Sequence, residues 1–393
     1  MAKVLVFADT VSVAHVVRPM RVATMLQALG HEVVFALPEA GRALLRTLDV
    51  PSVPVYGMAL DRFHRALRLL VPPFDRVGLD LCLADDLRAI DRVRPDAVVR
   101  DMRPSVVVAA HLRQVPCVTL LNAYWSPHSP RRLEVSDNVL TRIFGHDLTR
   151  ASLSHTGAPT MRHVLAPVNA QRAAHGLVPH GGDVFAVFAA GDRTVLLDHP
   201  GFVPLAADVA GQCIGPVLWN ADEGDAPPTE RPFVYVPVGS SGAPSLARAV
   251  VRALAASDAN VLVAAGRHYD KLADLAGPRV VAARTVDGEA ACGAARLVIS
   301  NGGSPQLWQA LEVGTPVFGL PSNIDQALNS RYADRTGAAR SLHALRATPR
   351  RLREALDAAL ADRGLCEAAQ AQAGRVAALD QPERLRLALH GIL

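Results

Sequence analysis

The feature that most limits the possible folds of this chain is a strand–loop–helix–strand unit that recurs along the sequence. In each unit a short apolar run is followed by a segment with apolar residues at helical spacing, and then by a second apolar run. Such units join parallel strands by a right-handed crossover, so they predict an open α/β sheet with functional residues at the carboxyl ends of its strands. The first 125 residues contain two units, with strands at Lys3–Ala8, Glu32–Leu37, Asp96–Arg100 and Cys117–Leu121 and helices at Arg18–Leu29 and Pro104–Arg113.

The pattern starts again after residues 216–232, an acidic, proline-rich segment that we interpret as a linker. The sequence therefore predicts two Rossmann-like α/β domains facing across a cleft, an N-terminal domain at 1–215 and a C-terminal domain at 233–375, followed by a helical segment at 376–393. Elements predicted after the linker are strands at Phe233–Pro237, Val261–Ala265, Val280–Ala283, Leu297–Ser300 and Pro316–Leu320, with a helix at Ser245–Ala256.

Composition excludes several classes of protein. With 50% hydrophobic and 20% charged residues the chain is not disordered, and its 393 residues suit two or three domains. The net charge of +4 is spread along the chain, and only 5% of residues are aromatic, so we expect no nucleic-acid partner. No apolar run approaches the roughly 18 residues of a transmembrane helix, and five widely spaced cysteines suggest buried thiols. We expect a cytoplasmic protein without a transmembrane segment.

Several catalytic motifs are missing. Neither domain contains G-x-G-x-x-G, a P-loop or G-x-S-x-G, which argues against nicotinamide redox chemistry, P-loop phosphoryl transfer and α/β-hydrolases. No D-x-D occurs, which removes the usual metal ligand of metal-dependent sugar transferases. We therefore expect no metal and no cofactor.

The most informative segment is the turn between a predicted strand and a predicted helix at 297–311. Gly302 and Gly303 let the backbone approach a ligand, Ser304 suits the N-cap and Pro305 suits the first helical position. A helix N-terminus of this kind favours an anion such as a diphosphate. The same features also occur in an ordinary strand-to-helix turn.

The order of motifs that follows resembles the donor-binding region of GT-B glycosyltransferases. Glu312–Pro321 and Asn323–Asn329 supply Gly-x-Pro-Val and Asp-Gln-x-x-Asn, and the match is to the UDP-glycosyltransferase-like family 1, of the bacterial natural-product and lipid type. Phe233–Ser241 is similar to the first strand and the glycine-serine loop of the family's second domain. The resemblance implies that the closing helix packs back on the N-terminal domain.

The resemblance also implies which residues bind the donor. Gly302, Gly303 and Ser304 would hold the diphosphate, and Asp325 and Gln326 would bind sugar hydroxyls, although Asp325 could instead cap a helix. Asn301 and Gln309 stand where the family has His and Glu. The full predicted donor set is Ser240, Ser241, Asn301, Gly302, Gly303, Ser304, Gln309, Asp325 and Gln326.

On the acceptor side, His15 follows the first strand in a loop before the predicted helix, in a segment similar to the family's opening segment with its catalytic base. Imidazole titrates in the range that a general base needs, and Asp101, at the end of another strand, would orient it. We expect Phe63, Tyr124 and Trp125 to contribute to acceptor binding, although such aromatics can equally be packing residues.

These observations predict an inverting glycosyltransferase that uses neither metal nor cofactor. It would move a sugar from a UDP- or dTDP-sugar to a hydroxyl of a small, lipophilic acceptor. Two alternatives remain: a nucleotide-sugar epimerase or hydrolase, and a non-catalytic GT-B-like protein that binds or activates a partner. The sequence leaves the oligomeric state open.

Overall fold

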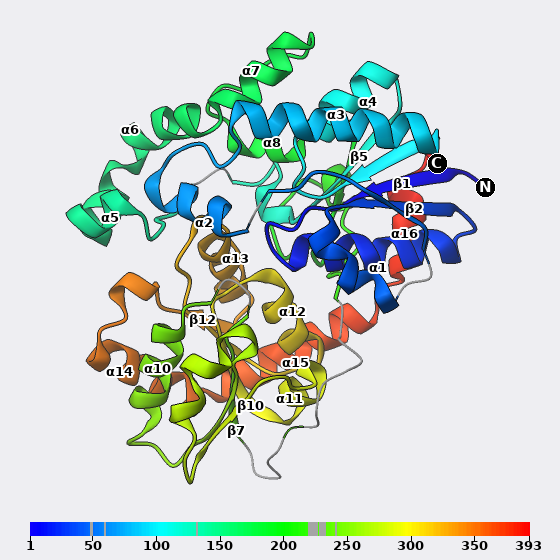
Figure 1. Ribbon diagram of the computed structural model, residues 1–393. Coiled ribbons are helices and arrows are strands. Elements are labelled where there is room, and N and C mark those ends of the chain that lie inside the picture. Colours follow the sequence, from blue (N-terminus) through cyan, green and yellow to red (C-terminus); the bar gives the residue numbers. More distant parts are fainter. Residues whose placement is uncertain (48–49, 59, 131–132, 219–226, 228–232, 240–241) are drawn as a thin grey trace.

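The structure is a computed structural model, which describes residues 1–47, 50–58, 60–130, 133–218, 227, 233–239 and 242–393. In this part of the chain, two parallel sheets of six strands each have the orders β3-β2-β1-β4-β5-β6 and β12-β11-β10-β7-β8-β9. When strands are counted from the start of each domain, both orders are 3-2-1-4-5-6, the order of Rossmann folds. The predicted fold class is therefore confirmed (Figure 1).

The N-terminal domain is built around the first sheet. Its strands are β1 (Lys3–Phe7), β2 (Glu32–Leu37), β3 (Ser52–Pro54), β4 (Ala97–Arg100), β5 (Cys117–Leu121) and β6 (Arg193–Leu196). Its helices are α1 (Ala14–Ala28), η1 (Glu39–Thr47), α2 (Leu60–Leu69), α3 (Arg76–Val93), α4 (Ser105–Arg113), η2 (Ala123–Trp125), α5 (Val139–Phe144), α6 (His146–Val164), α7 (Ala166–Ala174), α8 (Val184–Ala189) and α9 (Ala207–Ala210).

The C-terminal domain is built around the second sheet. Its strands are β7 (Phe233–Pro237), β8 (Asn260–Ala264), β9 (Val280–Ala283), β10 (Ala295–Ser300), β11 (Val317–Gly319) and β12 (Ala339–Ser341). Its helices are α10 (Pro244–Leu254), η3 (Gly266–Lys271), η4 (Ala273–Leu275), α11 (Gly288–Ala294), α12 (Ser304–Glu312), α13 (Ile324–Arg335), η5 (Ala344–Arg346), α14 (Pro349–Ala361) and α15 (Arg363–Ala377).

The apolar runs in the sequence form the central strands of both sheets. All five residues of β7 are buried, as are the last four of β1, because a parallel sheet is covered by helices on both faces. β1 pairs in parallel with β2 and β4, and β7 pairs with β8 and β10. The point at which the strand order reverses therefore lies between β1 and β4 in one domain and between β7 and β10 in the other.

Helix α1 begins at Ala14, four residues before the predicted start, so the prediction that His15 lies in a loop is wrong. The proline inside this helix, Pro19, has no N–H to donate to the carbonyl of His15, four residues earlier. The helix loses that one hydrogen bond but continues, because its buried face, which includes Val16 and Met20, packs on the sheet.

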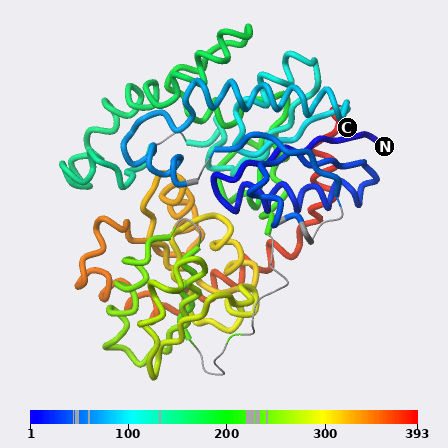
Figure 2. Tube along the Cα trace, viewed as in Figure 1, coloured from blue at the N-terminus to red at the C-terminus, as the bar shows by residue number. Residues whose placement is uncertain are grey.

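The chain crosses between the domains twice. The first crossing is the predicted linker, of which most residues lie outside the described part. The second follows α15, where the chain returns to the N-terminal domain as α16 (Gln381–Ala388), the red segment in Figure 2. Leu385 of α16 is fully buried in a cluster with residues of α1, and Arg384 donates to the carbonyl of Cys213 at 2.6 Å.

Direct polar contacts also join the two domains at the residues between η2 and α5. Arg331 of α13 pairs with Glu134 at 3.0 Å, and the Asp137 amide donates to the Ser322 carbonyl at 2.7 Å. None of the helices in the described part of the chain combines the length and the apolar character that crossing a bilayer requires.

Candidate active site

The two predicted catalytic residues meet at the point where the strand order of the first sheet reverses. His15 lies in the first turn of α1, after β1, and Asp101 directly follows the neighbouring strand β4. His15 Nδ1 lies 2.7 Å from Asp101 Oδ1. The carboxylate is 2% exposed and the imidazole 22%, so the pair is anchored inside the domain while the ring reaches the surface of the site.

The turn after β4 sets the direction of the Asp101 side chain. Met102, next to Asp101, has a φ of 52°, a left-handed conformation that costs a non-glycine residue about 1–2 kcal/mol. Such strain persists where the surroundings determine the backbone, and it is concentrated at functional sites. Here the turn places Asp101 toward α1.

Arg18, which the sequence analysis did not select, is the third member of this group. Its Nε and Nη2 atoms donate to the two oxygens of Asp101 at 3.1 and 3.0 Å, in the fork geometry that suits a carboxylate. Arg18 lies three residues after His15, so both side chains project from one face of α1. This spacing was the available sequence signal.

The group has a defined charge distribution. Burial disfavours the charged form of Asp101, but the charges of Arg18 and His15 and their hydrogen bonds outweigh it, so the pKa of Asp101 lies below its usual value. An ionised carboxylate only accepts, so a hydrogen bond from His15 to Asp101 requires the imidazole proton on Nδ1, which leaves Nε2 with a lone pair, although Arg18 Nη2 lies 2.8 Å from the same Nδ1. That tautomer is the one a general base requires.

A buried amide connects this group to the other domain. Asn122 directly follows β5, and its side-chain oxygen accepts from Arg18 Nη1. Its Nδ2 group donates to Ser304 Oγ, in the C-terminal domain, at 3.0 Å and to Asp198 at 3.2 Å. A continuous series of hydrogen bonds thus runs from His15 to the first residue of α12.

Asp198 provides a second connection to α12. It is fully buried after β6 and accepts from the indole Nε1 of Trp308 at 2.8 Å and from the Ala123 amide at 2.6 Å. Burial raises the pKa of Asp198, against the opposing effect of the hydrogen bonds from Trp308, Ala123 and Asn122. α12 is therefore held by two N-terminal-domain side chains, one at its first residue and one a turn later.

The predicted diphosphate residues, Gly302, Gly303 and Ser304, lie where β10 leads into α12. Gly302 has a φ of 79°, and a Cβ there would lie 2.3 Å from Ser330 Oγ, so both backbone conformation and space require glycine. Asn329 Nδ2, from the Asp-Gln-x-x-Asn motif, donates to the Gly302 carbonyl at 2.8 Å. This hydrogen bond gives the motif a structural role: it ties α13 to the loop.

The N-terminus of α12 differs from the prediction in one detail. Gly303 is the N-cap, not Ser304, which is the first helical residue, and the N-cap makes no side-chain hydrogen bond to the helix. Asn301 Oδ1 accepts from the Gly303 amide at 2.9 Å and so shapes the turn. Pro305 lies in the first turn, and a helix N-terminus of this kind favours an anion.

The two predicted sugar-binding residues lie in the first turn of α13. The cap of this helix is Asn323, so Asp325 is not an N-cap. Asp325 Oδ1 accepts from Tyr124 Oη at 3.1 Å and from Trp125 Nε1 at 2.8 Å. The side-chain oxygen of Gln326 accepts from the amide and hydroxyl of Ser322, at 2.9 and 3.0 Å.

The other predicted site residues have the following places. Ser240 and Ser241 lie outside the described residues. Gln309 packs against Gly288, where a Cβ would lie 2.6 Å from its Nε2. Phe63, 7% exposed, packs edge-on against Phe74 with ring centroids 5.8 Å apart. Tyr124 and Trp125 are buried at the domain interface.

Comparison with known proteins agrees with this architecture. The model of the glycosyltransferase family 28 C-terminal domain matches residues 233–381. CalG4, the calicheamicin glycosyltransferase, superposes with a TM-score of 0.71 at 18% identity, covering 100% of this chain and 99% of its own. The glycosyltransferase VinC, solved in complex with DTDP, superposes with a TM-score of 0.66 at 19% identity over 99% and 100% of the two chains. The fold is that of the GT-B class.

Relatives with similar sequences are also named as glycosyltransferases. A PGL/p-HBAD biosynthesis glycosyltransferase of Mycobacterium tuberculosis is 34% identical over 345 residues, 86% of this chain and 79% of the relative. A PGL/p-HBAD biosynthesis rhamnosyltransferase of Mycobacterium bovis is 34% identical over 353 residues, 86% of this chain and 76% of the relative. This chain belongs to the GT-B glycosyltransferases and is an enzyme.

Proposed function

We propose that this glycosyltransferase moves a sugar from a dTDP- or UDP-sugar to a hydroxyl of a small, lipophilic acceptor and inverts the anomeric carbon. The observation that carries the proposal is the buried series of hydrogen bonds from His15 to Ser304, which ties a paired base to the helix N-terminus suited to a diphosphate.

In this mechanism Nε2 of His15 takes the proton of the acceptor hydroxyl as its oxygen attacks the anomeric carbon. Asp101 holds the ring and balances the imidazolium charge that forms. The bond between the anomeric carbon and the diphosphate oxygen breaks, and the leaving diphosphate is stabilised at Gly302, Gly303 and Ser304. A single displacement from the opposite face inverts the configuration.

The helix N-terminus takes the part that a cation has in other sugar transferases, so we expect no metal and no cofactor. The described residues contain no group of three or more His, Cys, Asp or Glu side chains arranged to hold a metal ion. Turnover should therefore be unchanged by a chelator. A loss of activity on chelation, restored by a divalent cation, would contradict this part of the proposal.

A lipophilic acceptor is supported by the apolar surroundings of the segment before α1. Val11, from the segment that joins β1 to α1, belongs to one cluster with Met58, Phe63 and Phe74. Because one neighbour was solved with DTDP and one relative is named a rhamnosyltransferase, dTDP-rhamnose is the first donor to test.

The test is calorimetric titration with dTDP- and UDP-sugars, with Asp325→Ala as the control. We expect saturable binding of one donor and weaker binding to the variant. His15→Ala should bind the donor normally and lose at least about a hundredfold in turnover, the usual share of a general base. Absence of nucleotide binding would favour the non-catalytic alternative, and donor turnover without an acceptor would favour an epimerase or hydrolase.

A further inference from the structure

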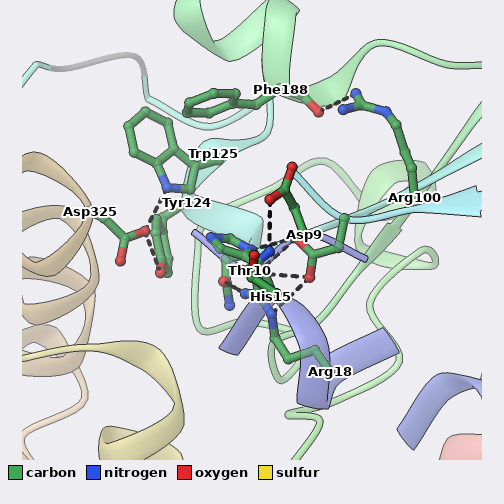
Figure 3. A network of polar contacts seen from close by, with 11 residues as sticks. Asp9, Thr10, His15, Arg18, Arg100, Tyr124, Trp125, Phe188 and Asp325 are labelled. Carbon is green, nitrogen blue, oxygen red and sulfur yellow. Dashed lines mark hydrogen bonds and ion pairs between the residues drawn. The ribbon is translucent and has the colours of Figure 1, made fainter. Parts of the chain in front are cut away.

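Two N-terminal-domain side chains donate to one oxygen of a C-terminal-domain carboxylate. Tyr124 and Trp125 form η2, directly after Asn122, and both reach Asp325 Oδ1. Figure 3 shows the three side chains next to the group that contains His15 and Arg18. Asp325 Oδ2 accepts no hydrogen bond from the described residues.

The aromatic pair is rigidly held. Tyr124 is 1% and Trp125 8% exposed, and the indole packs edge-on against Phe188 with ring centroids 4.9 Å apart. A buried hydroxyl or indole N–H needs an acceptor, and Asp325 Oδ1 serves both. Burial and the nearby Asp325 and Asp198 carboxylates raise the pKa of Tyr124 well above its usual value, so its hydroxyl keeps its proton and donates.

Asp325 belongs electrostatically to the catalytic group. Burial disfavours the charge of Arg18, but the carboxylates of Asp101, Asp325 and Asp198 outweigh it, so the pKa of Arg18 lies above its usual value. Asp325 is also only partly buried, unlike the fully buried Asp198, so its second oxygen is accessible to a ligand. A carboxylate so placed, with one oxygen occupied and the other open, presents a single acceptor.

We propose that Tyr124 and Trp125 are specificity residues of the donor-sugar subsite, which act by orienting Asp325, and that they are not acceptor contacts. The inference rests on the proposed function. With Oδ1 saturated, the carboxylate binds one sugar hydroxyl through Oδ2 and not two vicinal hydroxyls. The enzyme therefore accepts nucleotide sugars that lack the hydroxyl next to the bound one.

The first test is a double-mutant cycle on donor binding, measured by calorimetry with the dTDP- or UDP-sugar that the wild type binds more tightly. Tyr124→Phe removes one oxygen atom and keeps the ring, so the core packing is preserved. We expect it to weaken nucleotide-sugar binding about tenfold, or 1.4 kcal/mol, and to leave binding of the free nucleoside diphosphate unchanged. In the Asp325→Ala background it should have no further effect.

Tyr269→Phe is the matched control, because it removes the same atom from a partly buried tyrosine on η3, which has no hydrogen bond to Asp325. It should change neither affinity. Equal loss of nucleoside-diphosphate binding in Tyr124→Phe, or additive losses in the cycle, would show a merely structural role and overturn the inference. Tighter sugar binding in Tyr124→Phe would show that the pair blocks the subsite, and would overturn it as well.

The second test uses Trp125→Phe with a series of the same nucleotide sugar lacking one hydroxyl at a time. The wild type should lose affinity at a single position. In the variant Oδ1 keeps the Tyr124 hydroxyl but loses the indole N–H, which opens one acceptor position, so an adjacent position should also lose about tenfold when its hydroxyl is removed. An unchanged pattern would overturn the inference, whereas failure of the wild type to bind any nucleoside diphosphate would instead overturn the proposed function.

Discussion

Replacing Arg18 by methionine tests the charge arrangement around the base directly. The guanidinium donates to both oxygens of Asp101, and its Nη2 lies 2.8 Å from His15 Nδ1. Two unit charges about 4 Å apart interact by about 1 kcal/mol in water and about 4 kcal/mol near a protein surface. Asp101 is only 2% exposed, so its interaction with Arg18 is stronger than the value in water.

Without Arg18, Asp101 loses the nearest charge that holds its pKa below the usual value, so the pKa of Asp101 should rise. The acidic limb of the profile of kcat/KM against pH should therefore move upward in Arg18→Met, because an ionised Asp101 positions the base. The variant should also lose about 3–5 kcal/mol in the free energy of unfolding, because Asp101 is left buried with one partner fewer.

The assay is sugar transfer measured across the range in which histidine titrates, alongside urea unfolding. Arg18→Lys keeps the charge and should keep the position of the limb, while losing the hydrogen bond to Asn122. Arg21→Met, on an exposed position of the same helix, is the control for loss of a positive charge. A folded Arg18→Met enzyme with an unmoved acidic limb would refute the reasoning.

Three further substitutions test other parts of the site. Asp101→Asn should lower the free energy of unfolding by about 3 kcal/mol at neutral pH. Because the pKa of Asp101 is lowered in the folded protein, the stability that its charge contributes is complete above the usual carboxyl pKa and is lost as the pH falls through the pKa of the folded state. The difference in unfolding free energy from wild type should therefore shrink below about pH 4 in urea titrations. Gly302→Ala should lower the free energy of unfolding by about 1–2 kcal/mol and raise the KM for the donor, because the position has a positive φ and the new Cβ would meet the Ser330 hydroxyl. Gly293→Ala is the control: it lies in a helix, its new Cβ has no neighbour within 4 Å, and it should be neutral or stabilising in thermal unfolding. Asn122→Ala breaks the link to α12 and should lower kcat about tenfold at saturating donor, and an unchanged kcat would show that the link is dispensable.

The alternation of apolar strands and amphipathic helices was enough to predict both domains. The central strands are each several buried residues long, and such runs are distinct in a sequence. The three strands that the analysis missed, β3, β6 and β12, are three or four residues long. Each mixes apolar residues with Ser52, Arg193 or Ser341, unlike the equally short but wholly apolar β9, which was predicted.

The site was predicted where a residue follows a recognisable strand or sits in a motif, as with His15, Asp101 and Gly302. Asp198 was not predicted as a site residue, because it follows β6, a strand that the sequence pattern did not indicate. Trp308 has the spacing of a core residue on α12, and nothing local shows that its N–H reaches a carboxylate of the other domain. Contacts between residues 110 positions apart depend on how the domains meet, which local patterns do not encode.

The return of the chain to the N-terminal domain makes the C-terminal domain an insertion within the first one. During synthesis the surface of α1 that receives Leu385 stays uncovered until α16 has been made. The first domain is consequently completed only after the second has been translated, although its sheet is translated first. A fragment that stops at residue 215 would expose this apolar surface, whereas a version with residues 381–393 joined back by a short connection would restore it.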